Sequence, residues 1–296
     1  MKKVLAILLV VLMLGAFAAC KTEDVNDVTV APEATAEETL GEINVVSREE
    51  GSGTRGAFVE LTGVEIKDAD GKKIDMTTED AEVTNSTTIM MTSVANNKAA
   101  IGYISLGSLD STVKALNFEG VTPSAATVKD GSYKLARPFL LVTKDKLSAP
   151  AQDFYDFILS KEGQEIVKNN HYVALDNAPD YAASGAKGKV VVAGSSSVSP
   201  LMEKLIEAYK ALNSDVEIKL ETSDSGTGIK SAQDGICDIG MSSRDLKDTE
   251  TGVEGTKICM DGIVVIVNND NPITNITKEQ VAGIYTGEIT DWADVA

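Results

Sequence analysis

The chain has 296 residues, a single histidine, three cysteines and a net charge of −18 at pH 7. Such an acidic balance argues against binding to nucleic acid or to an anionic membrane surface. The length suits two domains better than one.

The first 20 residues predict an export signal, because a basic start precedes an apolar run, 4–19, that is short for a membrane span. Phe17-Ala18-Ala19-Cys20 resembles a bacterial lipoprotein processing site, although phenylalanine is unusual at its first position. Cys20 would then carry lipid and become the mature N-terminus, and a plain signal peptide cut nearby is the alternative. Residues 21–40, acidic and rich in Thr, Ala and Glu, predict a disordered tether.

The stretch 47–58 predicts an anion-binding loop between a buried strand, 43–46, and a helix. Unpaired N–H groups and the positive end of the helix dipole attract anions to such a position. Gly51 and Gly53 let the main chain approach a ligand, while Ser52, Thr54 and Arg48 add donors. The alternative is a capped helix after a turn. The loop is not of the Walker type, since no Lys-Ser/Thr pair follows the second glycine.

The middle of the chain alternates strand-like and helix-like patterns. His171 lies in a polar turn and is predicted to be solvated. The predicted elements are a charged surface connection at 68–80, a hydroxyl-rich helix start at 84–88, buried strands at 99–104 and 135–142, and one packed helix at 153–168.

Three further segments repeat the pattern of a strand, a small hydroxyl-rich loop and a helix, at 191–200, 222–229 and 238–244. Each could be ordinary helix capping. Four such helix starts in one chain suggest instead that the loops converge on one anion.

Cys237 and Cys259 each lie beside an apolar strand-like run. An exported compartment permits a disulfide between them, and two buried thiols are the alternative. Their spacing fits no zinc pattern, so we expect no metal and no cofactor.

Alternation of apolar runs with helical patterns predicts an α/β class with mostly parallel sheets. The motifs at 45–58, 193–200, 223–230, 237–246 and 261–292 resemble the phosphate-binding proteins of bacterial phosphate ABC importers, over nearly all of the mature chain. That resemblance implies a two-lobed, periplasmic-binding-protein-like fold of type II, with crossing hinge strands at 261–268 and 135–142. One lobe would combine 41–136 with 261–296, and the other would be continuous over 137–260.

The order of the segments departs from that family. In the usual family order, the segment that corresponds to residues 189–296 precedes the segment that corresponds to residues 41–181. In this chain the two segments are exchanged. We expect a circular permutation, with the small, polar stretch 178–188 joining the former ends. A truncated tandem of two such proteins is the alternative.

The resemblance implies an extracytoplasmic binding lipoprotein, anchored to the outer face of the cell membrane through Cys20. It would capture inorganic phosphate between the lobes and deliver it to the permease subunits of an ABC importer. The overall acidity does not prevent this, because salt screens long-range charge and local donors act in a closed pocket. The ligand-binding residues carried over from the family are Arg48, Ser52, Gly53, Thr54, Ser196, Ser197, Ser225 and Ser243.

Discrimination of phosphate from sulfate needs an acceptor for the proton of hydrogen phosphate. Some family members place an aspartate at the position of Ser243, where this chain has serine. Asp224 or Glu49 is the candidate acceptor in its place, and either could instead orient Arg48 or cap a helix.

The sequence leaves three alternative functions. A hydrolase is disfavoured, because no histidine lies in any motif and no nucleophile elbow follows a strand. A receptor for sulfate or molybdate, or a phosphate sensor without transport, would use the same fold.

Overall fold

The computed structural model describes residues 40–144 and 146–295. The predicted signal peptide, Cys20 and all but the last residue of the predicted tether lie outside the described residues. Within them, no helix is both long and apolar enough to cross a membrane. The helices are α1 (Gly53–Thr62), α2 (Thr87–Ala95), α3 (Ala125–Lys129), α4 (Ala149–Leu159), α5 (Lys161–Asn169), α6 (Ser199–Leu212), α7 (Ser225–Gln233) and α8 (Lys278–Thr286).

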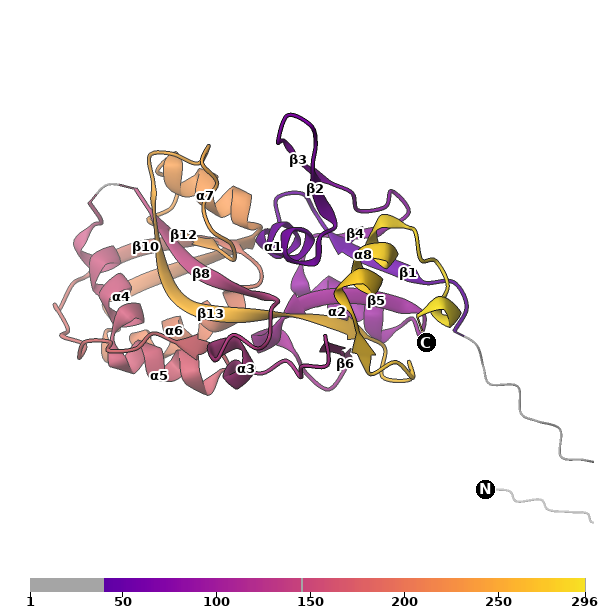
Figure 1. Ribbon diagram of the computed structural model, residues 1–296. Coiled ribbons are helices and arrows are strands. Elements are labelled where there is room, and N and C mark those ends of the chain that lie inside the picture. Colours follow the sequence, from indigo (N-terminus) through magenta and orange to yellow (C-terminus); the bar gives the residue numbers. More distant parts are fainter. Residues whose placement is uncertain (1–39, 145, 296) are drawn as a thin grey trace, which may run out of the picture. The chain divides into compact units, whose positions relative to one another are not determined.

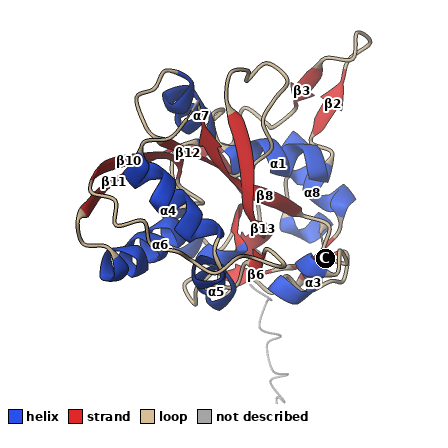
Figure 2. Ribbon diagram, turned by 90° about the vertical axis from the view of Figure 1, so that its left-hand side faces the viewer, coloured by secondary structure: helices blue, strands red, loops and turns tan. Residues whose placement is uncertain are grey.

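The strands form one ten-stranded mixed sheet and two small pairs. Figure 1 labels most of the main strands and Figure 2 shows the helices packed around them. The path of the large sheet is β11-β10-β12-β8-β13-β5-β1-β4, with β6 and β9 paired to β13. The strands are β1 (Asn44–Arg48), β2 (Glu65–Lys67), β3 (Lys73–Asp75), β4 (Glu82–Thr84), β5 (Ala100–Ser105), β6 (Lys114–Ala115), β7 (Asn117–Phe118), β8 (Ala136–Thr143), β9 (Val173–Ala174), β10 (Gly188–Ser195), β11 (Val216–Ser223), β12 (Ile239–Ser242), β13 (Glu254–Val267) and β14 (Asn275–Ile276).

The α/β class predicted from the sequence is confirmed, and the sheet is mixed. At one end β1 runs parallel to β4 and β5, and at the other β10 runs parallel to β11 and β12. Between them β8 and β13 run antiparallel to each other and to their outer neighbours. The long strand β13 passes through both halves of the sheet (Figure 1).

Two large hydrophobic clusters divide along this path. The buried members of the first core come from residues 43–135 and 263–295, and those of the second core from residues 139–259. Burial of this apolar surface is the main favourable term in folding. The strands β8 and β13 connect the two cores.

The two chain segments at the edge of the first core lie side by side. The Ile43 N–H donates to the carbonyl of Thr290 at 2.8 Å, and the Trp292 N–H donates to Gly41 at 3.0 Å. An antiparallel bridge joins Glu42 to Asp291 between them. Residues before β1 and residues after α8 are therefore neighbours in space.

Two sequence predictions need correction. The segment 238–244 starts no helix, because β12 ends at Ser242 and only bends and turns lie between it and β13. The single helix predicted over 153–168 is two helices, because Ser160 ends α4 and its hydroxyl caps α5 by accepting the Gly163 N–H. The charged connection predicted at 68–80 lies at the surface and includes β3, which pairs with β2 in a hairpin where Ile66 lies opposite Ile74. His171 is exposed, as predicted, in the turn after α5.

Candidate functional site

Four helix N-termini meet where the two cores face each other. Ser52 caps α1 by accepting the N–H of Arg55, and Asp224 caps α7 by accepting the N–H of Thr227. The loop before α6 and the start of α2 complete the group through Ser196 and Thr87, whose hydroxyls lie 3.5 Å apart. Because each helix start carries partial positive charge, the group is suited to an anion.

Arg48 is the charged donor of this group. It ends β1, its side chain is only 2% exposed, and its N–H donates to the Tyr103 hydroxyl at 3.1 Å. Nε and Nη2 donate to the two carboxylate oxygens of Glu49 at 2.8 Å each. Nη2 also donates to Ser196 Oγ at 3.0 Å, which links the first core to the loop before α6. The guanidinium is thus held in one plane and presented to the opposite loop.

Further contacts bring α1 against the second core. The hydroxyls of Thr54 and Ser197 lie 2.7 Å apart. Gly53 approaches so closely that an added Cβ would lie 2.3 Å from Ser225 Oγ and 2.7 Å from Ser243 Oγ. A glycine is therefore required here by the space between the two faces.

The second core supplies a buried set of serine hydroxyls. Ser243 Oγ accepts from the hydroxyl of Ser195 at 3.0 Å and lies 3.2 Å from Ser225 Oγ. The Ser243 N–H donates to Ser225 Oγ at 3.0 Å. All three residues are buried, and hydroxyls can turn to donate or accept as the site requires.

All eight residues predicted from the sequence lie in this cluster or in the loops that form it. Two more hydroxyl residues belong to it, namely Ser195 and Thr87, and both are buried. Both lie in segments that the sequence marks as hydroxyl-rich helix starts, but the sequence alone does not distinguish them from capping residues.

The two candidate proton acceptors lie beside the cluster. Both carboxylate oxygens of Glu49 accept hydrogen bonds from Arg48. The Asp224 carboxylate caps the start of α7, because it accepts the Thr227 N–H at 2.9 Å and the Thr227 hydroxyl at 2.5 Å. An added Cβ on Gly51 would lie 2.2 Å from Asp224 Oδ1, so this carboxylate packs directly against the Arg48 loop. A carboxylate has about four acceptor positions, so both retain some capacity.

A buried ion pair joins the strands that connect the cores. Arg137 on β8 donates Nη2 to Asp261 Oδ2 on β13 at 3.1 Å, and the Ser105 hydroxyl donates to Oδ1 at 2.9 Å. Burial raises the pKa of Asp261 to about 6, although Arg137 and the Ser105 bond oppose the shift. Burial of the whole pair means that removing either partner would leave an uncompensated charge.

Cys237 and Cys259 are free, buried thiols. Burial raises the pKa of Cys237 to about 11 and that of Cys259 well above its usual value. Among the described residues, no group of three or more His, Cys, Asp or Glu side chains could hold a metal ion.

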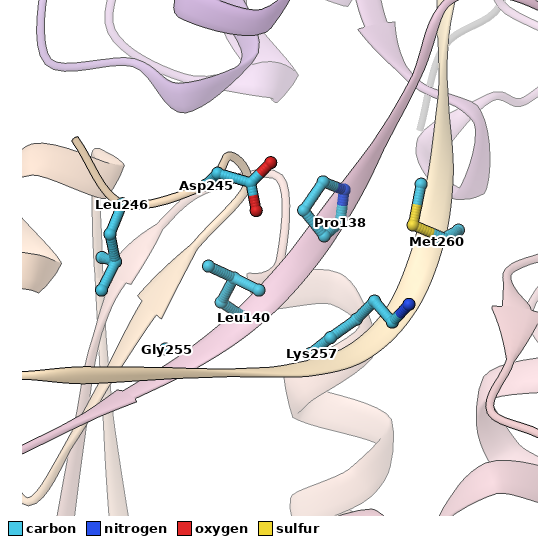
Figure 3. Close-up of a pocket in the computed structure, with 7 residues that line it drawn as sticks. All are labelled: Pro138, Leu140, Asp245, Leu246, Gly255, Lys257 and Met260. Carbon is cyan, nitrogen blue, oxygen red and sulfur yellow. The ribbon is translucent and has the colours of Figure 1, made fainter. Parts of the chain in front are cut away.

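A cavity of about 570 Å³ lies beside the connecting strands (Figure 3), and none of the predicted site residues lines it. Its lining combines apolar side chains with one acidic and one basic side chain: Pro138, Leu140, Asp245, Leu246, Gly255, Lys257 and Met260.

Comparisons with known proteins point to one family. The model of the PBP superfamily domain matches residues 33–162 and 180–296. A phosphate-binding protein PstS 2 of Streptococcus agalactiae is 52% identical over 86% of this chain and 88% of its own. The phosphate-binding protein PstS 2 of Streptococcus pneumoniae is 46% identical over 88% of this chain and 89% of its own.

A solved structure agrees with these relatives. The crystal structure of a phosphate ABC transporter, phosphate-binding protein from Streptococcus pneumoniae TIGR4 is 46% identical, with a TM-score of 0.69. The match covers 86% of this chain and all of that one.

Proposed function

We infer that this chain, which belongs to the PstS-like phosphate-binding proteins with a PBP superfamily domain, binds inorganic phosphate and delivers it to an ABC importer. Its relatives are binding proteins of transport systems, so the chain is a binding protein and not an enzyme. The observation that carries the proposal is the contact of Arg48 with Ser196 among four helix N-termini.

The phosphate is proposed to lie between the two cores. A buried oxyanion needs donors on every side, since an uncompensated buried charge costs several kcal/mol. Guanidinium, hydroxyl and backbone N–H groups supply such donors. The proposed ligands are Arg48, Ser52, Gly53, Thr54, Ser196, Ser197, Ser225 and Ser243.

Binding is proposed to draw two lobes together about β8 and β13. One lobe comprises residues 41–136 and 261–296, and the other residues 137–260. The division is supported by the two hydrophobic cores, whose buried members fall on either side of it. Closure would complete the donor shell and exclude water from the anion.

Asp224 or Glu49 is proposed to accept the proton of hydrogen phosphate. Asp224 is favoured by its contact with Gly51, whereas Glu49 is favoured by its bonds to Arg48. Titration of Asp224→Asn and Glu49→Gln with phosphate and sulfate separates them. An unchanged preference for phosphate in both variants would rule out both.

We further propose that the chain is exported and lipidated at Cys20, and that its segments are circularly permuted relative to family members with the usual segment order. The permutation is supported by the pairing of residues 41–43 with residues 290–292. In a member with the usual order, these segments would be continuous.

The central proposal is tested by calorimetric titration of protein stripped of bound ligand. Phosphate should bind with a 1:1 stoichiometry and raise the melting temperature by mass action, while sulfate and molybdate should bind more weakly. Phosphoesters should not be hydrolysed. Absence of phosphate binding, or tighter binding of another oxyanion, would contradict the proposal.

A further inference from the structure

The loop that carries Arg48 and Ser52 is fastened at both ends by Arg55. The Arg55 N–H donates to Ser52 Oγ at 3.3 Å, and its Nη1 donates to the carbonyl oxygen of Arg48 at 2.7 Å. Within the loop, the Ser52 N–H donates to the Glu49 carbonyl at 3.0 Å. One residue in the first turn of α1 therefore holds two of the proposed anion-binding residues.

Arg55 is held in turn by the β2–β3 hairpin. Its Nε donates to Asp75 Oδ2 at 2.7 Å, and the Arg55 side chain is only 16% exposed. Asp75 is itself fixed by the N–H of Thr77 at 2.9 Å. The hairpin extends away from the large sheet in both ribbon views (Figures 1 and 2).

A second ion pair attaches the same hairpin to the same helix. Lys73 on β3 lies 3.2 Å from Glu60 on α1 and 3.0 Å from Glu65 on β2. Lys73 and Glu60 are well exposed, and this pair lies further along α1, away from the Arg48 loop. It provides a matched control, because it joins hairpin to helix without a bond to Arg48 or Ser52.

We propose that the Arg55 side chain, braced by Asp75, is a positioning group that holds the Arg48 loop and sets the Arg48 guanidinium for the anion, while the Arg55 backbone N–H holds Ser52. The proposal rests on the proposed function. Arg55 fixes the peptide plane between Arg48 and Glu49, and Glu49 in turn orients the guanidinium. A donor set held in place before binding loses less entropy when the ligand arrives.

Arg55 also brings positive charge near the site, and this effect must be separated from positioning. Arg55→Lys keeps this charge and loses the planar fork, so it separates the two effects. The part of a charge effect that acts through solvent also weakens as salt is added, because the Debye length falls from about 10 Å at 0.1 M to about 3 Å at 1 M. A loss of loop geometry persists at high salt.

The first test compares Arg55→Met with Lys73→Met by phosphate titration at low and high salt. We expect Arg55→Met to weaken binding about tenfold at both salt concentrations, which corresponds to one lost hydrogen bond of about 1.4 kcal/mol. Lys73→Met should stay within about twofold of the parent, since exposed pairs contribute little. Arg55→Lys should be intermediate, because an ammonium lacks the planar fork that reaches both partners.

The second test needs no ligand. Amide hydrogen exchange of residues 49–52 in the ligand-free protein should quicken several-fold in Arg55→Met and stay unchanged in Lys73→Met. If the parent protein does not bind phosphate, the proposed function fails, and exchange alone decides whether Arg55 braces the loop. Affinity within twofold of the parent in Arg55→Met, a loss that disappears at high salt, an equal loss in Lys73→Met, or unchanged exchange would each overturn the inference.

Discussion

Replacing Gly53 by alanine tests whether phosphate binding needs the close contact between α1 and the serine cluster. The added Cβ would lie 2.3 Å from Ser225 Oγ and 3.0 Å from Ser225 Cβ, so turning the hydroxyl alone cannot relieve the overlap. Because carbon atoms prefer about 3.5–4.0 Å, the two faces must separate by about 1 Å.

A separation of that size would stretch two contacts between the faces. Arg48–Ser196, now 3.0 Å, and Thr54–Ser197, now 2.7 Å, would both exceed normal hydrogen-bond length. One charged and one neutral hydrogen bond together contribute about 2–4 kcal/mol. We therefore expect Gly53→Ala to weaken phosphate binding about 30- to 1,000-fold.

The Gly53→Ala replacement should not lower the stability of the ligand-free protein. Under the proposed lobe closure, the two faces part about β8 and β13 without ligand while each hydrophobic core stays intact. Alanine is also a better helix former than glycine by about 1 kcal/mol. Calorimetric titration gives the affinity, and urea unfolding of the ligand-free variant gives the stability.

Gly56→Ala on the same helix is the control, since its Cβ would lie at an ordinary 3.6 Å from Arg244 Cδ. Binding by Gly53→Ala within threefold of the parent, or an equal loss in Gly56→Ala, would refute the reasoning.

Three further predictions concern buried charges. Arg48→Met should weaken phosphate binding about 10- to 200-fold in titrations, as a charged hydrogen bond contributes about 1.5–3 kcal/mol, and full affinity in this variant would contradict the proposed site. Asp153→Asn should lower stability by about 2 kcal/mol at neutral pH. Burial raises the pKa of Asp153, but hydrogen bonds led by that from Tyr209 outweigh it and lower the pKa to about 2, from 3.8. The stabilisation is therefore complete above about pH 4 and lost as pH falls through about 2, and parallel urea curves at pH 7 and pH 3 check this. Asp261→Asn should cost about 3–5 kcal/mol by leaving Arg137 unpaired, whereas the double replacement Arg137→Met/Asp261→Leu should cost less. Additive losses in urea unfolding would exclude that coupling.

The local chemistry of the site was predictable from the sequence. Glycine, serine and threonine at a helix start favour capping and expose backbone donors, whatever the rest of the chain does. The hydroxyl-rich segments 47–58, 191–200 and 222–229 are identified on that ground, whereas the ligand-binding residues within them come from the family resemblance. The α/β class followed in the same way from hydrophobic periodicity.

The boundaries of the helices and the contact partners of the side chains could be determined only from the tertiary structure. Ser160 splits a region of continuous helical periodicity, since its hydroxyl donates to the Phe157 carbonyl at the end of α4 and accepts the Gly163 N–H at the start of α5. The hairpin at 65–75 lies in a charged stretch, and ion pairs join it to α1.

Periodicity reports which face of an element is buried and contains no information on which distant element covers it. Arg48 and Ser196 are 148 positions apart, and only the packing of two cores along β8 and β13 brings them to 3.0 Å. The packing of the β2–β3 hairpin against α1 likewise brings Arg55 to Asp75, a contact that neither residue type reveals in the sequence.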